Sequence, residues 1–234
     1  MLLITSGVGS PESVYARAHA IALAKKTDSL LQLVPLMYAA GHAAYTAGDY
    51  ESAATLADEA LELAERERNP ANLGLANGLQ VVVRHFRGDL AGAEEHFAHG
   101  LKFFEDSTIW QLPLLRLTPL GIASWNACAL GRADLARERL ARVMAAANQN
   151  NPAEVAWSGA LGAFSYLLLR DSEQAEMLAA QALELSEKHQ MPHFAEYARR
   201  YLGLARAAGS SDRRCCADSP GNHGLRRHRG TPRH

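Results

Sequence analysis

Apolar residues recur every three or four positions along most of this chain, which is the spacing of one face of an α-helix. Gly turns and Asn-Pro pairs interrupt the pattern at regular intervals and mark where helices should end. The pattern predicts an all-helical chain. The expected helices cover residues 11–26, 29–47, 50–67, 71–87, 90–105, 112–130, 133–148, 153–169, 172–189 and 192–208.

The helical pattern also repeats. With Gly48, Gly88, Gly131 and Arg170 as origins, the copies lie 40, 43 and 39 residues apart. Three later positions hold small or apolar residues in every copy. They are +5 (Ala53, Ala93, Ala136, Ala175), +9 (Ala57, Phe97, Leu140, Ala179) and +12 (Ala60, Gly100, Val143, Ala182). Small residues at +5 and +12 let a preceding helix approach closely, so each copy should be one helix pair.

Stacked helix pairs of this kind predict an all-α fold, a right-handed superhelical solenoid of antiparallel helix pairs with an inner groove and an outer face. We expect a short N-terminal remnant at 1–10 and the solenoid at 11–208. Residues 209–234 change abruptly in composition and form a basic tail.

Two interpretations of that tail compete. It could be a basic arm that binds nucleic acid or a metal through Cys215, Cys216, His223 and His228, or it could be disordered and out of frame. Adjacent cysteines lack the spacing of a zinc site, and the tail offers few aliphatic residues to bury, so disorder is favoured.

The stretch "GDYESAATLADEALEL" resembles the turn and second helix of the tetratricopeptide repeat. The matching residues are Gly48, Asp49, Tyr50, Ala53, Ala60 and Leu61. The repeats here exceed the usual length of about 34 residues. Such elongated repeats are similar to the C-terminal solenoids of large bacterial signalling ATPases, which often carry a nucleotide-cyclase or helix-turn-helix domain. The resemblance covers about residues 10–208.

That resemblance implies a non-catalytic regulatory module whose partner is a protein or peptide, such as the ATPase or cyclase domain of a parent protein. Two alternatives stay open. The solenoid could be the ligand-sensing part of a transcriptional activator, or it could enclose the small-molecule pocket of an enzyme.

Composition and charge limit the classes of partner that this chain is expected to bind. The chain has 234 residues, 48% hydrophobic and 21% charged, as is ordinary for a globular protein. The tail holds six Arg against two Asp, which leaves −5 for the rest of the chain, given the overall −1. An acidic body argues against nucleic acid as the main partner.

Cysteine usage and hydropathy bear on location. Three cysteines suit a reducing compartment, and no apolar run approaches about 18 residues, so we expect a cytoplasmic location without membrane contact.

Candidate chemistry is sparse. The start "LLITSGVGSPES" lacks the Gly-Lys-Ser/Thr ending of a phosphate-binding loop. His96 and His99 could share a helix face and bind a metal, but solvated surface is favoured, and Cys128 is expected to be a packing residue. We therefore expect no catalytic residue, no cofactor and no metal.

The repeat register predicts which side chains face the groove. Counting back from each origin gives Tyr38, His42, Tyr45, Val82, His85, Trp125, Cys128, Trp157, Phe164 and Leu167. The set contains no Lys or Asn, so a clamp for acidic peptide termini is not expected. Its aromatic character suits an apolar or helical peptide. The alternative is that Trp125 and Phe164 are simply buried between repeats.

The ends of the solenoid look uncapped. The helix at 192–208 places Phe194, Tyr197, Tyr201 and Leu204 on one side, and no partner helix follows it. Exposed apolar ends predict self-association.

Overall fold

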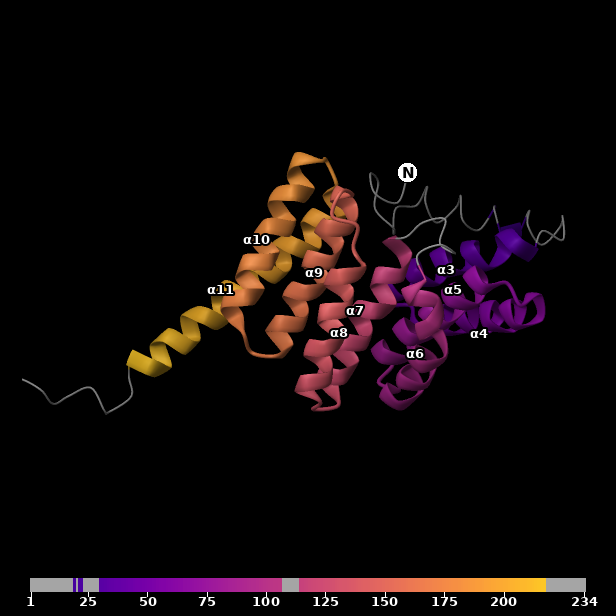
Figure 1. Cartoon of the computed structure of the whole chain (residues 1–234), viewed down its shortest axis with the longest axis horizontal. Helices are drawn as coiled ribbons and strands as arrows, with labels where there is room; N and C mark the ends of the chain where they lie inside the picture. Colours follow the sequence, from indigo (N-terminus) through magenta and orange to yellow (C-terminus); the bar gives the residue numbers. More distant parts are fainter. Residues whose placement is uncertain (1–18, 20, 23–29, 107–113, 218–234) are drawn as a thin grey trace, which may run out of the picture.

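The computed structural model describes residues 19, 21–22, 30–106 and 114–217 (Figure 1). These ranges contain long helices and no strand, which confirms the all-α prediction. The helices are α3 (Leu30–Thr46), α4 (Tyr50–Glu67), α5 (Pro70–Phe86), α6 (Leu90–Glu105), α7 (Leu114–Ala129), α8 (Ala133–Ala146), α9 (Pro152–Leu168), α10 (Ser172–Lys188) and α11 (Pro192–Ala217).

The helix boundaries agree with the sequence pattern to within two residues except at one end. The helix expected at 192–208 continues to Ala217, so its predicted end is wrong by nine residues. Gly209 and the serines after it lower helix propensity without breaking a helix as Pro does. The rest of the expected tail, with His223 and His228, and nearly all of the expected helix 11–26 lie outside the described residues.

The turn within each helix pair follows from its origin residue. Gly48, Gly88 and Gly131 have φ of 85°, 82° and 73°, and Arg170 takes the same left-handed conformation at 61°. In three of the four copies the next residue is Asp, whose carboxylate accepts a backbone N–H of the following helix, as Asp49 does from Ser52 at 3.1 Å. The Gly-Asp signature is therefore a turn followed by a helix cap.

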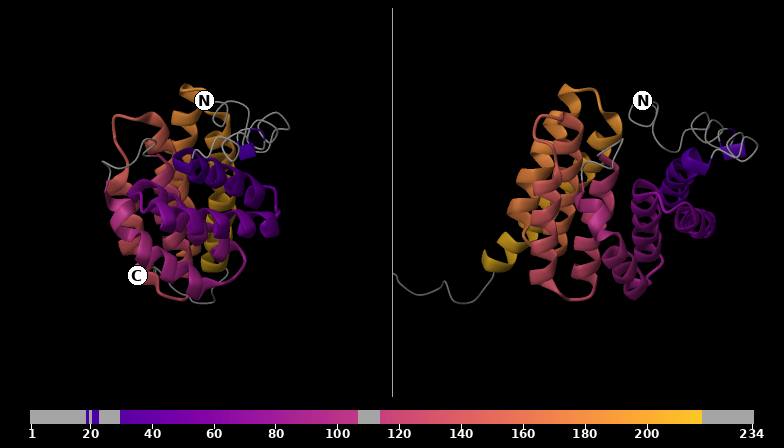
Figure 2. Two further views of the ribbon diagram at one scale, coloured as in Figure 1. Left: turned by 90° about the vertical axis from the view of Figure 1, so that its right-hand side faces the viewer. Right: turned by 45° about the vertical axis from the view of Figure 1, so that its right-hand side comes forward.

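The pairs are α3–α4, α5–α6, α7–α8 and α9–α10, and they stack in sequence order along the long axis of the molecule (Figures 1 and 2). The first helices of successive pairs pack on one another, so that α3, α5, α7, α9 and α11 form a continuous row. Each second helix packs against its own partner and the first helix of the next pair. This neighbour-to-neighbour packing is the arrangement of a solenoid.

Small buried residues hold the pairs together. The alanines at +5 (Ala53, Ala93, Ala136, Ala175) are at most 1% exposed. The +9 and +12 residues are buried as well. Because only a methyl group occupies each +5 contact, the helices of a pair can approach closely there, as the repeat pattern predicts.

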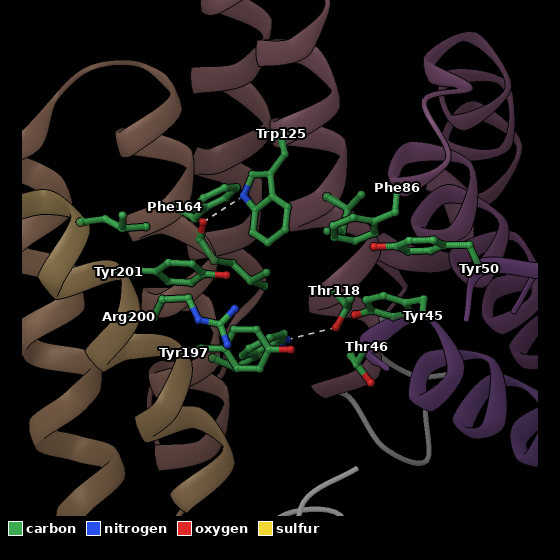
Figure 3. A pocket seen from close by; sticks show the side chains of 14 residues that line it. Tyr45, Thr46, Tyr50, Phe86, Thr118, Trp125, Phe164, Tyr197, Arg200 and Tyr201 are labelled. Atoms are coloured by element: carbon green, nitrogen blue, oxygen red, sulfur yellow. Dashed lines mark hydrogen bonds between the residues drawn. The ribbon is translucent and has the colours of Figure 1, made fainter. Parts of the chain in front are cut away.

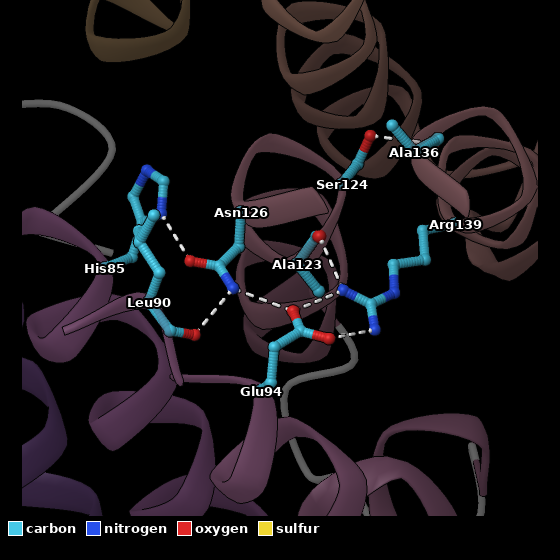
Figure 4. Close-up of polar contacts among 8 residues, drawn as sticks. All are labelled: His85, Leu90, Glu94, Ala123, Ser124, Asn126, Ala136 and Arg139. Carbon is cyan, nitrogen blue, oxygen red and sulfur yellow. Dashed lines mark hydrogen bonds and ion pairs between the residues drawn. The ribbon is translucent and has the colours of Figure 1, made fainter. Parts of the chain in front are cut away.

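Polar side chains join the second pair to the third (Figure 4). Glu94 of α6 accepts two hydrogen bonds from Arg139 of α8, at 2.6 and 2.7 Å, and one from Asn126 of α7 at 2.7 Å. Asn126 also bonds the Nδ1 atom of His85 at 3.0 Å. Burial opposes the charged form of Glu94, but these hydrogen bonds outweigh it and lower its pKa. Four helices are fixed to one another through these side chains.

Candidate functional site

A cavity of about 300 Å³ opens on the row of first helices (Figure 3). We call it the aromatic pocket, because eight of its fourteen lining residues are aromatic. The aromatic members are Tyr45, Tyr50, Phe86, Trp125, Trp157, Phe164, Tyr197 and Tyr201. Thr46, Thr118, Ile122, Leu161, Arg200 and Leu204 complete the wall. The lining comes from both ends of the described solenoid, from α3 to α11.

Hydrogen bonds fix the two indole rings of the floor. Trp125 donates its Nε1–H to the backbone carbonyl of Leu161 at 3.2 Å, and Trp157 donates to Thr118 Oγ1 at 3.1 Å (Figure 3). Each bond joins α7 to α9. Because both indole N–H groups are satisfied inside the protein, the rings present their apolar surface to the cavity.

Contacts between aromatic rings extend this apolar surface from α7 and α9 to α11. Phe164 lies edge-on to Trp125, with centroids 4.7 Å apart, and packs on Tyr201 at 5.0 Å. Trp157 contacts Tyr197 at 5.3 Å. The aromatic side chains of α7, α9 and α11 therefore form one connected wall.

The opposite wall belongs to the first two pairs. Tyr45 of α3 stacks on Phe86 of α5 at 5.2 Å, and its hydroxyl hydrogen-bonds His42 Nε2 at 2.9 Å. Burial, followed by the proximity of Tyr197, Tyr38 and Tyr201, raises the pKa of Tyr45 well above its usual value. Tyr45 is therefore a neutral phenol facing α11 across the cavity (Figure 3).

One charged side chain lines the aromatic pocket. Arg200 of α11 places its guanidinium carbon 5.2 Å from the centroid of the Tyr197 ring. Burial raises the pKa of Tyr197 and of Tyr201, so both phenols stay protonated. The pocket is thus apolar, hydroxyl-bearing and positively charged at one point.

The structure distributes the predicted groove residues between pocket and core. Four of them, Tyr45, Trp125, Trp157 and Phe164, line the aromatic pocket. Tyr38 and Val82 are buried at 3% and 0% exposure. The other four, His42, His85, Cys128 and Leu167, are half-buried outside the pocket lining. Trp125 and Trp157 are only 5% and 6% exposed, so these rings serve both the core and the pocket wall.

Sequence reasoning missed the contribution of α11. The register list ended with the fourth copy, yet α9 and α11 begin with Pro152 and Pro192, one repeat of 40 residues apart. That shift carries Trp157 to Tyr197, Leu161 to Tyr201 and Phe164 to Leu204, all of which line the pocket. The repeat spacing itself was the signal. Arg200 has no such counterpart, because the same shift relates it to Ala160.

The other candidate groups make structural contacts. His96 is half-buried and bonds Asn77 Oδ1 at 3.1 Å, while the ring of His99 lies 6.4 Å from it and is exposed. Burial raises the pKa of the Cys128 thiol, which disfavours a nucleophilic thiolate. In the part of the chain that the structure describes, no three His, Cys, Asp or Glu side chains gather as metal ligands. Nor does any helix in that part have the length and apolarity needed to span a bilayer.

No family model matches this chain, and no curated protein is found to be related to it.

Proposed function

We propose that this chain is a non-catalytic regulatory module that binds an apolar segment of a partner protein in the aromatic pocket. The observation that supports this function is the wall of eight aromatic rings drawn from six helices. Aromatic side chains provide large contact areas with few rotatable bonds, so they bind apolar segments at a low entropic cost. Helical peptides dock into apolar grooves in this way.

The resemblance to elongated tetratricopeptide repeats extends the proposal. We place the module in the cytoplasm of a bacterium, within a signalling protein of the ATPase or cyclase type. Its partner there is the ATPase or cyclase domain, whose activity the bound state would restrain or release.

A second function, sensing of a small molecule by a transcriptional activator, is favoured by the size of the cavity. About 300 Å³ is the lower limit of ordinary small-molecule sites. A free small molecule would fill the pocket without contacting the surface around it, whereas a peptide must also contact the rim.

Selection of short random peptides displayed on phage tests the docking function. Peptides selected on the wild-type protein should share aromatic or aliphatic anchors. Their synthetic versions should bind about tenfold more weakly to Phe86→Ser, because Phe86 lines the pocket. Phe86 is 39% exposed, so this change should leave the fold intact.

Met177→Ser is the matched control. Met177 is a similarly exposed apolar residue, at 44%, on α10 and outside the pocket lining. The control should bind the selected peptides as the wild type does. Equal weakening by both substitutions, or binding that neither affects, would contradict docking in the aromatic pocket.

A further inference from the structure

Arg200 is the charged group at the aromatic pocket, and the other lining residues are all uncharged. Two other arginines of α11 form ion pairs, Arg199 with Glu187 and Arg206 with Glu176, each at 2.9 Å. Among the described residues, Arg200 forms no ion pair, even with Glu196 one turn before it. Its guanidinium is therefore not paired with a carboxylate in the described part of the chain and lies exposed beside the cavity.

Tyr197 and Tyr201 place two phenol rings near this charge (Figure 3). The Tyr201 side chain is 6% exposed, and its hydroxyl points into the pocket beside Arg200 (Figure 3). Within the described ranges, neither Tyr197 nor Tyr201 uses its hydroxyl in a hydrogen bond to the protein. A guanidinium and two neutral phenols can all donate to the same acceptor.

An acceptor with a negative charge fits this set best. Carboxylates accept charge-assisted hydrogen bonds from Arg, and because Arg200 is exposed the gain from this attraction is modest. A cationic group would gain contact with the rings but would meet the charge of Arg200. We therefore expect the pocket to bind a negatively charged group more tightly than a positively charged one.

We propose that the aromatic pocket selects partner segments in which an aromatic anchor is followed by an acidic side chain, with Arg200 binding the carboxylate. The inference rests on the docking function proposed above and names the chemistry of the segment. The aromatic anchor fills the cavity between Trp125 and Tyr45, and the acidic side chain reaches the α11 rim.

Three capped dipeptides test this selectivity: Ac-Trp-Glu-NH2, Ac-Trp-Gln-NH2 and Ac-Trp-Lys-NH2. They are titrated into the ¹⁵N-labelled full chain, and binding is followed by the indole N–H signals of Trp125 and Trp157, each assigned by Trp→Phe substitution. The wild type should bind the Glu peptide about three- to tenfold more tightly than the Gln peptide, and the Lys peptide most weakly. Added salt should reduce the preference.

Arg200→Gln should bring the Glu and Gln peptides to within about twofold of each other while leaving affinity for the Gln peptide nearly unchanged. Arg199→Gln is the matched control, because Arg199 is adjacent, exposed and outside the pocket lining. This variant should keep the wild-type preference.

Equal affinity for the Glu and Gln peptides, a preference that survives Arg200→Gln, or tightest binding of the Lys peptide would overturn the inference and leave peptide docking standing. Failure of all three dipeptides to shift either indole signal would overturn the inference too. The phage selection would then decide separately whether docking itself holds.

Discussion

Glu94 and Arg139 form a two-pronged ion pair between α6 and α8, with both carboxylate oxygens bonded to the guanidinium at 2.6 and 2.7 Å. Their side chains are 21% and 10% exposed. Arg139 also donates to the backbone carbonyl of Ala123 and lies over the Phe97 ring. The pair therefore joins two successive repeats at a site with little access to water.

Glu94→Gln should lower the free energy of unfolding by about 2 kcal/mol, because it leaves the guanidinium of Arg139 largely buried without a counter-charge. Urea unfolding followed by circular dichroism measures the change. Glu105→Gln is the control, since Glu105 pairs with Arg142 at an exposed site and should cost at most about 1 kcal/mol. A larger loss at Glu105 than at Glu94 would show that burial does not set the cost.

Acidification should destabilise the fold through three histidines. Burial lowers the pKa of His85, His96 and His193 in the folded state, so the unfolded chain binds their protons more readily. The free energy of unfolding should therefore fall as the pH drops from about 7.5 to about 5.5, through the ordinary histidine range.

His85→Gln should make this fall shallower in urea unfolding at several pH values, and His189→Gln, on an exposed turn, controls for the substitution itself. A steeper fall in the His85 variant would mean that the sign of its contribution is wrong.

Ala136→Leu should cost about 1–3 kcal/mol, because Ala136 is fully buried where α8 packs on α7. Ala141→Leu places the same side chain on an exposed position of the same helix and should be nearly neutral. Thermal unfolding of both variants compares them. Similar melting temperatures would argue that the small +5 residues are not required for packing.

Two substitutions in the turns within the helix pairs should change the free energy of unfolding in opposite directions. Gly88→Ala should destabilise by about 1 kcal/mol, since φ is 82° and an added Cβ would meet nothing within 4 Å, so the cost is conformational alone. Arg170→Gly should stabilise by up to about 1 kcal/mol, because Arg170 holds a φ of 61°. Chemical unfolding of the two variants should show these opposite signs, and changes in the same direction would sink the idea.

Amide hydrogen exchange should be faster in the last turns of α11 than in α7. The described part of α11 packs mainly on α9 and α10, and its C-terminal end projects from the stack (Figure 1), whereas α7 packs on α5, α6, α8 and α9. Mass-spectrometric exchange resolves the two segments. Equal protection along the chain would show that the stack opens as one unit.

The fold could be predicted because its signal is repeated. Each origin residue, each Asp cap and each buried Ala occurs in several copies, so the pattern outweighs local exceptions such as Arg132, where the Asp cap is absent. The end of α11 was missed because a change in composition does not by itself end a helix.

The aromatic pocket could be predicted only in part. Register identifies which residues of a repeat face inward, as it did for Trp125 and Phe164, but it does not say how tightly the superhelix winds. That winding decides that Tyr38 is buried while Tyr45 faces Tyr201. The contacts of Glu94 with Asn126 and Arg139 depend on three helices meeting at one point, and no spacing within one helix encodes them.

In a stack where each helix pair contacts only its neighbours, a structural change at one end reaches the other end only through the helix pairs between them. The aromatic pocket is different, because Tyr45 and Tyr201 belong to the first and last described helices and face the same small space. A molecule that contacts both residues would therefore link the first and last described helices directly and oppose changes in the pitch of the superhelix. Occupation of this one site would then alter the distance and angle between the two ends of the stack.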